Sequence, residues 1–140
     1  RWDFGGIGKG MAADLAGEIL RSHGCPHFQV DCSGDLLVGE AINTNSNWSI
    51  ATEIEGVKIP VPSNHAVACS GDLHQFLVHE GNRYSHIMDP RTGQFVLNQN
   101  LIFVIAPTAT KADAWATALS VENELLRPKD IHTVQYPFPE

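Results

Sequence analysis

Cysteine, methionine and aromatic residues are scarce in this chain of 140 residues, which has three Cys, two Met and 8% aromatic residues. An odd number of Cys without Cys-x-x-Cys spacing argues against both a disulfide framework and a zinc ribbon. Cys25, Cys32 and Cys69 are therefore expected to be small buried thiols. No apolar run approaches the roughly 20 residues of a membrane-spanning helix.

Basic residues are also few, with 9 Lys and Arg against 16 Asp and Glu, for a net charge of −7. A nucleic-acid surface needs clustered Lys and Arg, so we predict no nucleic-acid partner. What the chain does have is 43% hydrophobic and 18% charged residues, the composition of an ordinary globular protein. Its length predicts a single domain, residues 1–140.

The first predicted helix covers about residues 9–23. Met11, Leu15 and Ile19 recur every four residues along it and are expected to form its buried face. Asp14 belongs to the polar face, which we expect to meet water. A glycine follows the last residue and provides the C-terminal stop.

The second predicted helix, residues 108–119, is apolar in nearly every direction and is therefore expected to be buried. Thr108 or Thr110 can cap its first turn, and Asp113 favours its dipole. Asp113 and Thr117 are four residues apart and project from one face. A buried carboxylate needs a partner, which can be a backbone amide, a core Arg or a hard cation bound by both side chains. The pair alone favours the amide or the Arg.

Short apolar or alternating segments separated by turn residues predict strands. The expected strands are residues 27–31, 36–42, 48–54, 57–61, 66–69, 75–79, 84–88, 101–106 and 132–136. Many short, closely spaced strands with two main helices indicate an α+β fold with a mixed, largely antiparallel sheet.

A glycine-rich turn, residues 5–10 with the sequence GGIGKG, leads into the first helix. Backbone N–H groups and the helix dipole at such a position favour a phosphate. The spacing is neither that of a P-loop nor GxGxxG. Lys9 is either a phosphate contact or a solvated Lys at a helix start. The turn, the basic residue and the helix start together predict phosphate binding.

Residues 84–93, with the sequence YSHIMDPRTG, are the densest run of functional groups. They contain a turn in which Asp89 can act as the cap and Arg91 can pair with it. His86 suits proton transfer, because the imidazole side chain of histidine can donate or accept a proton, although a structural role is commoner for a His in a strand. Ser70 lacks the G-x-S-x-G nucleophile elbow, so a turn is its favoured role.

Taken in order, five segments of the chain resemble the ApbE family, the FAD:protein FMN transferases. The segments are residues 3–12 (DFGGIGKGMA), 30–35 (VDCSGD), 68–72 (ACSGD), 84–93 (YSHIMDPRTG) and 106–119 (APTATKADAWATAL). Each is modest alone, but five in the family's order and spacing are specific. The resemblance implies an ApbE-like α+β fold.

The resemblance also implies Mg²⁺ as cofactor and FAD as substrate, and it assigns roles to residues. The implied Mg²⁺ ligands are Asp113, Thr117 and the backbone carbonyl of Gly6. The implied FAD contacts are Asp3, Lys9, Ile87, Ser70, Gly71, Asp89 and Arg91. His86 is the candidate catalytic residue. Mg²⁺ keeps few protein ligands and takes the others from substrate phosphates and water, which fits this ligand set.

The implied reaction transfers FMN from FAD to a Ser or Thr hydroxyl of a target flavoprotein, the expected partner, and releases AMP. The cation would polarise the pyrophosphate. His86 would take the proton from the attacking hydroxyl, which is typically worth about 10²–10⁴-fold. Two alternatives stay open: an FAD pyrophosphatase, in which water replaces the hydroxyl and yields FMN and AMP, and a flavin-binding module without turnover.

The chain departs from the family in sequence and in length. Ser33 replaces the first Gly of the usual Gly-Gly-Asp. The family's N-terminal half, which precedes the glycine turn, is missing. We therefore expect a fragment, a pocket completed by a second polypeptide, or a reduced relative. Family members usually work outside the cytoplasmic membrane, often as lipoproteins, so the resemblance implies an extracytoplasmic location.

Overall fold

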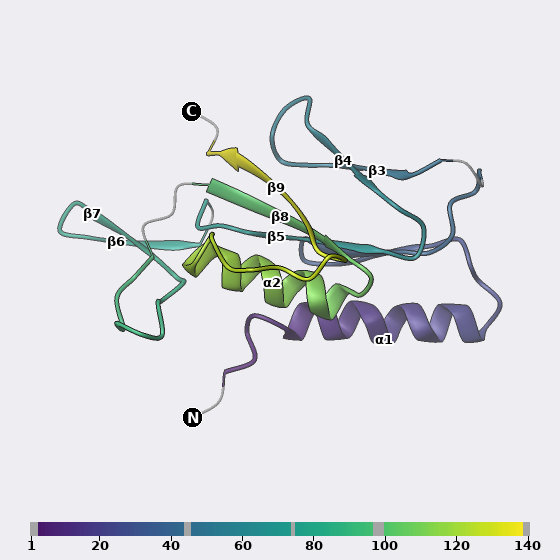
Figure 1. Ribbon diagram of the computed structural model, residues 1–140, viewed down its shortest axis with the longest axis horizontal. Helices are drawn as coiled ribbons and strands as arrows, with labels where there is room; N and C mark the ends of the chain where they lie inside the picture. The colour runs from purple at the N-terminus through teal and green to yellow at the C-terminus, as the bar shows by residue number, and fades with distance from the viewer. Residues whose placement is uncertain (1–2, 44–45, 74, 97–99, 139–140) are drawn as a thin grey trace.

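The computed structural model describes residues 3–43, 46–73, 75–96 and 100–138 (Figure 1). The two helices are α1 (Gly8–Ser22) and α2 (Ala109–Val121). The strands are β1 (Gln29–Cys32), β2 (Asp35–Val38), β3 (Trp48–Ala51), β4 (Lys58–Val61), β5 (Ala66–Ser70), β6 (Phe76–His79), β7 (Asn82–Ser85), β8 (Asn100–Ala106) and β9 (His132–Pro137). The predicted α+β fold is confirmed. Neither of these helices has the length and apolar character that crossing a membrane requires.

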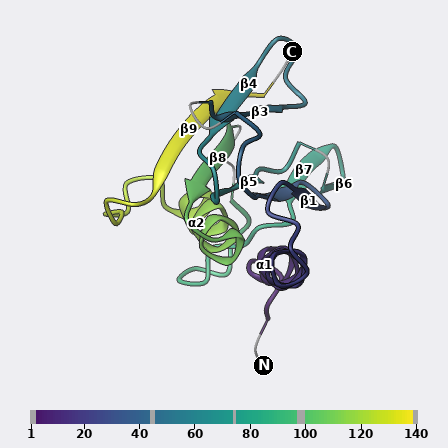
Figure 2. The ribbon, with the colours of Figure 1, turned by 90° about the vertical axis from the view of Figure 1, so that its right-hand side faces the viewer.

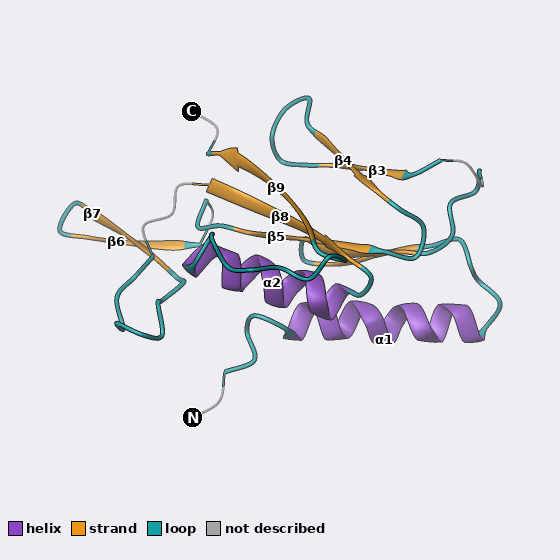
Figure 3. Cartoon of the chain, in the orientation of Figure 1, coloured by secondary structure: helices purple, strands orange, loops and turns teal. Residues whose placement is uncertain are grey.

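The main sheet has five strands in the order β1-β2-β5-β8-β9, and each neighbouring pair is antiparallel. Within it, β8 pairs with β5 on one side and with β9 on the other. Two separate two-stranded hairpins, β3–β4 and β6–β7, complete the strands of the described residues (Figure 3). The predicted predominance of antiparallel pairing is therefore confirmed.

The sheet lies between a helical layer and a hairpin. Figures 1 and 2 show α1 and α2 along one face and β3–β4 over the other. Side chains alternate between these faces along β8, as the two-residue period of a strand requires. Ile102 and Val104 join the apolar cluster of the helices, whereas Phe103 and Ile105 join that of the hairpin.

The predicted buried face of α1 is wrong. Met11, Leu15 and Ile19 are 47%, 58% and 60% exposed, and the buried positions are instead Gly10, Ala13 and Gly17. Small residues let the backbone of α1 approach its neighbours closely. A Cβ on Gly10 would lie 2.3 Å from the carbonyl oxygen of Ala109.

The two helices bind each other's N-terminal ends through carboxylates. Asp14 of α1, which was expected in water, accepts hydrogen bonds from the backbone N–H groups of Ala109 (2.8 Å) and Thr110 (2.9 Å). Asp113 of α2 accepts one from the N–H of Gly10 at 3.0 Å. Asp113 therefore lies at the positive end of α1. The sequence-based expectation that it would lie at the positive end of its own helix, α2, is wrong. Thr108 is the N-cap of α2, as predicted.

The predicted strand 84–88 is also displaced. Strand β7 ends at Ser85, and beyond it the backbone makes an isolated bridge between Met88 and Phe95. His86 and Ile87 therefore lie in an irregular segment between the hairpin and the turn at residues 89–93. The alternating pattern of this region could not distinguish a strand from a segment that is extended only in part.

The close contact at Gly10 predicts an asymmetry between two glycines of one helix. Gly10→Ala should lower the free energy of unfolding by about 3 kcal/mol, because the new methyl group would press on backbone atoms of α2. Gly8→Ala should leave it unchanged or raise it by up to about 1 kcal/mol, because a Cβ there meets no atom within 4 Å. Urea unfolding of both variants provides the measurement, and equal effects would contradict the close approach.

Candidate functional site

One large cavity collects nearly all the predicted site residues. Its volume is about 1,600 Å³, above the roughly 300–1,000 Å³ of common small-molecule pockets. Among the described residues its lining includes Asp3, Gly6, Lys9, Ser70, Gly71, His86, Ile87, Arg91, Asp113 and Thr117. Asp89 is the one predicted site residue outside this lining. Segments that are far apart in the sequence therefore meet at a single site.

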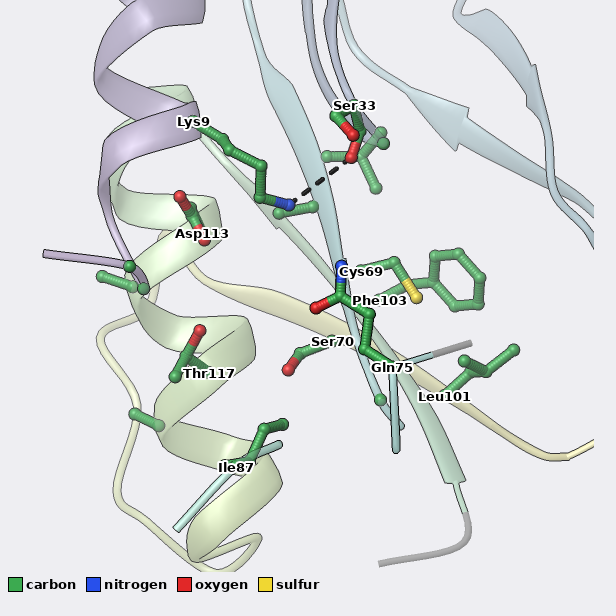
Figure 4. A pocket seen from close by; sticks show the side chains of 18 of the residues that line it. Lys9, Ser33, Cys69, Ser70, Gln75, Ile87, Leu101, Phe103, Asp113 and Thr117 are labelled. Carbon is green, nitrogen blue, oxygen red and sulfur yellow. Dashed lines mark hydrogen bonds between the residues drawn. The ribbon is translucent and has the colours of Figure 1, made fainter. Parts of the chain in front are cut away.

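The three predicted Mg²⁺ ligands lie together where the glycine turn passes α2. Asp113 is 4% exposed, and Thr117 follows one turn later on the same helix. A Cβ built on Gly6 would lie 3.1 Å from Thr117 Oγ1, so the turn passes directly over this hydroxyl. Figure 4 shows Asp113 and Thr117 projecting from α2 into the cavity, with Ser70 across from them.

The donor set at this point fits a hard divalent cation. A carboxylate, a hydroxyl and a backbone carbonyl are the oxygen ligands that Mg²⁺ prefers. The described residues contain no group of three His, Cys, Asp or Glu able to hold a metal, so the remaining ligands would come from a substrate and water. Asp113 has the backbone-amide partner considered above, yet a neutral N–H does not cancel its charge.

The glycine turn itself has few free donors for a phosphate. The N–H groups of Ile7 and Gly8 both donate to the carbonyl of Phe4, at 3.1 and 2.9 Å, and that of Gly10 donates to Asp113. A carboxylate of the protein thus occupies the place at the N-terminus of α1 where an anion would otherwise bind. Of the groups at this end of the cavity, Lys9 is the one that could still donate to an anion.

Lys9 is held against the turn between β1 and β2. Its Nζ lies 3.0 Å from Asp35 Oδ2 and donates to the carbonyl oxygen of Ser33 at 3.5 Å (Figure 4). An ammonium group has three N–H donors, so one is left for a ligand. Ser33 has φ +57°, a left-handed backbone that favours Gly, the residue that the resemblance noted above leads one to expect here.

Asp35 is a buried acid that the sequence did not single out. It is 1% exposed, and neither carboxylate oxygen has a hydrogen-bond partner that meets geometric criteria among the described residues, although Oδ2 makes the ion pair with Lys9. Burial, together with the nearby carboxylate of Asp113, raises the pKa of Asp35 to about 6 despite the ion pair with Lys9. A charged, buried and incompletely bonded oxygen beside a cavity is typical of a functional site rather than of a packing position.

His86 has a defined orientation although it is exposed. Its Nδ1 lies 2.7 Å from the carbonyl oxygen of Gln75. A carbonyl can only accept, so Nδ1 carries the proton and the neutral ring keeps its lone pair on Nε2. His86 lines the cavity and can therefore accept a proton there. The strand pattern did not predict this contact.

Arg91 is occupied by carboxylates of the protein. Its Nε and Nη2 donate to Asp89, and its Nη1 donates to Glu122 Oε2 at 3.1 Å. Hydrogen bonds from Arg91 hold the pKa of Asp89 below its ordinary value. These bonds fasten the turn after β7 to the end of α2. This arrangement matches the structural alternative considered for Asp89 and Arg91 in the sequence.

Cys69 lines the cavity as an unreactive thiol. Burial first, and then the carboxylates of Glu53 and Asp35, raise the pKa of its thiol to about 12. It therefore stays protonated and is no nucleophile at neutral pH. The expectation of buried thiols is wrong for Cys25, which is exposed, while Cys32 and Cys69 are half-buried.

The fold and the cavity define an α+β protein whose one large cavity, within the described residues, is lined by the oxygen donors Asp113 and Thr117 and by Lys9. The sequence model of the ApbE family matches residues 1–128, and the chain belongs to this family. The FAD:protein FMN transferase of Vibrio cholerae serotype O1 is 32% identical to it over 87% of this chain. That of Escherichia coli strain K12 is 34% identical over 85%.

Solved structures agree with this family assignment. The crystal structure of the ApbE protein from Thermotoga maritima superimposes with a TM-score of 0.76 at 35% identity and covers 86% of this chain. The apo flavinyl transferase ApbE from Pseudomonas stutzeri superimposes with a TM-score of 0.72 at 26% identity and covers 96%. The matches span 39% and 36% of the two curated relatives and 41% and 49% of these structures, so the chain corresponds to less than half of each.

The raised pKa of Asp35 predicts a stability difference that depends on pH. The folded state binds this proton more tightly than the unfolded state, whose ordinary value is 3.8. Stability contributed by Asp35 is therefore lost as pH rises from about 4 to about 6, by about 3 kcal/mol in total. Asp35→Asn should show no such loss. The free energy of unfolding of this variant, relative to that of the wild type, should therefore increase across this pH window and then stay constant.

Urea unfolding at several pH values measures this difference. Asp130→Asn is the matched control, because Asp130 also lies 3.0 Å from a Lys Nζ, that of Lys111, but at the exposed surface. A gap between wild type and Asp35→Asn that is constant with pH, or that shrinks as pH rises, would contradict the burial of an ionised Asp35.

Proposed function

We propose that this chain carries the cation and phosphate site of a Mg²⁺-dependent FAD:protein FMN transferase. The enzyme transfers FMN from FAD to a Ser or Thr hydroxyl of an acceptor flavoprotein and releases AMP. The two curated relatives bear the name of this activity. Since the chain spans less than half of their length, the activity of the whole protein is part of the proposal.

The observation that carries the proposal is the meeting of the glycine turn with α2. It brings the Gly6 backbone, the Thr117 hydroxyl and the Asp113 carboxylate to one wall of a cavity large enough for a dinucleotide. These three groups would hold Mg²⁺. When bound, Mg²⁺ would polarise the pyrophosphate and offset the charge that develops on the leaving AMP.

The chain's own groups then have separate tasks. Lys9 binds a phosphate oxygen with the N–H that Asp35 and Ser33 leave free. His86 accepts the proton of the attacking hydroxyl at Nε2, because its Nδ1 hydrogen bond to the Gln75 carbonyl fixes the tautomer. The O–P bond to the acceptor forms as the bond between the two phosphates breaks, so AMP departs with the electron pair.

The reaction products test this assignment. The chain is incubated with FAD, Mg²⁺ and a Ser/Thr acceptor peptide, and flavin fluorescence of the peptide is measured together with AMP. We expect labelled peptide and AMP in equal amounts, and neither without Mg²⁺. AMP with free FMN and no label would identify a pyrophosphatase instead. FAD binding without AMP would identify a flavin-binding module.

The role of His86 predicts a selective loss of turnover. His86→Ala should lower the transfer rate by about 10²–10⁴-fold and leave FAD binding in the presence of Mg²⁺ unchanged, because the imidazole moves a proton and does not hold the substrate. His79→Ala is the matched control, since His79 is exposed on the β6–β7 hairpin that precedes His86 but lies outside the cavity lining. Wild-type turnover by His86→Ala would remove His86 from the chemistry.

A further inference from the structure

The cavity wall is acidic although the proposed substrate is an anion. Among the described residues that line it, the acids are Asp3, Asp31, Glu53, Asp113 and Glu122, and the bases are Lys9 and Arg91. Arg91 donates to Asp89 and Glu122, so its charge is already offset. Within this lining, Lys9 is therefore the cation available to a phosphate.

Asp35 removes most of the attraction that Lys9 would exert. Its Oδ2 is 3.0 Å from Lys9 Nζ, and the carboxylate of Asp113 lies close to that of Asp35. At neutral or higher pH, these two carboxylates and one ammonium carry a net charge of −1. Asp35 is 1% exposed, so water and salt screen its charge far less than that of a surface acid. The ammonium of Lys9 at 3.0 Å favours the ionised form of Asp35, and the test at about pH 8 is far above the ordinary titration range of a carboxyl group.

The N-terminus of α1 provides little compensation. The N–H groups of Ile7 and Gly8 already donate to the Phe4 carbonyl, and that of Gly10 donates to Asp113. A divalent cation changes the balance, because it would turn the local charge from −1 to +1. The cluster thus repels a bare pyrophosphate and attracts one that arrives with, or after, a cation.

We propose that Asp35 makes pyrophosphate binding in this cavity conditional on a divalent cation. Its buried charge cancels that of Lys9, so the metal-free anion is rejected. The inference rests on the proposed function, because it takes the pyrophosphate of FAD as the anion that this end of the cavity receives. The benefit for such an enzyme is that FAD without the cation needed for its cleavage does not occupy the site.

The test measures binding of inorganic pyrophosphate by calorimetry at about pH 8, once with EDTA and once with excess Mg²⁺. One unit charge about 10 Å away, at an effective dielectric constant of about 20, changes an affinity by roughly tenfold. Asp35→Asn should therefore bind metal-free pyrophosphate at least about tenfold more tightly than wild type. Asp35→Leu, a second neutral side chain of similar size, should show the same gain, and Asp130→Asn should show none.

A Lys9→Met background separates repulsion from a positioning role. If Asp35 acts by its charge, Asp35→Asn should tighten metal-free binding in Lys9→Met as well. If Asp35 only orients Lys9, the substitution should weaken binding in wild type and have no effect once Lys9 is gone. That result would overturn the proposal, as would a wild type that binds pyrophosphate equally well with and without Mg²⁺.

These outcomes do not depend on flavin transfer. Inorganic pyrophosphate contains no flavin, and the measurement needs neither an acceptor nor turnover. A chain that fails to release AMP from FAD but gains metal-free pyrophosphate binding on Asp35→Asn would contradict the proposed function and support this inference. A chain that transfers FMN, but whose Asp35→Asn variant binds metal-free pyrophosphate no more tightly, would support the proposed function and contradict this inference.

Discussion

The exchange of carboxylates between α1 and α2 is the constraint on which the site depends. Asp14 binds the N-terminal N–H groups of α2, and Asp113 binds that of Gly10 in α1. Each acid satisfies backbone donors that a helix cannot satisfy itself, and each lies at the positive end of a helix dipole. Because Gly10 has no side chain, the helices come close enough for these bonds to form. The same approach carries the glycine turn over Thr117.

The site combines groups that are costly to bury. Asp35 and Asp113 are nearly inaccessible acids close to each other, with a single ammonium beside Asp35. Apolar side chains at these positions would be easier to accommodate in a protein interior. The proposed cation, bound to both the protein and a diphosphate, would account for such a cluster, since the ion would supply the positive charge that the protein lacks. Stability is therefore lowered at the point where the chemistry is proposed to occur.

Much of the fold could be predicted from local patterns. The antiparallel strands, the first helix with its glycine stop and the buried helix after residue 107 all follow from periodicity and turn residues. The i, i+4 spacing placed Asp113 and Thr117 on one face, and the family motifs added Gly6. These features depend on residues close in sequence, so the amino-acid sequence alone contains the information.

Other features depend on contacts between distant residues and were missed. The bonds of Asp14 and Asp113 span 95 and 103 residues. The sequence of α1 contains both a stripe of large apolar residues and a stripe of small residues, and only the stripe of small residues lets the two helices touch. Asp35 resembled an ordinary turn residue, and its burial depends on how strands and helices pack around it. The partner of His86 is a backbone carbonyl, which leaves no signal in the sequence.

A crystal of this chain soaked in Mn²⁺ and measured at the manganese absorption edge tests most directly whether these oxygens hold a divalent ion. We expect an anomalous peak bonded to the Asp113 carboxylate, the Thr117 hydroxyl and the Gly6 carbonyl, with waters as the other ligands. A manganese peak bound to other protein groups, with no peak at these three, would contradict the cation site. It would also contradict the chemistry assigned to the cavity.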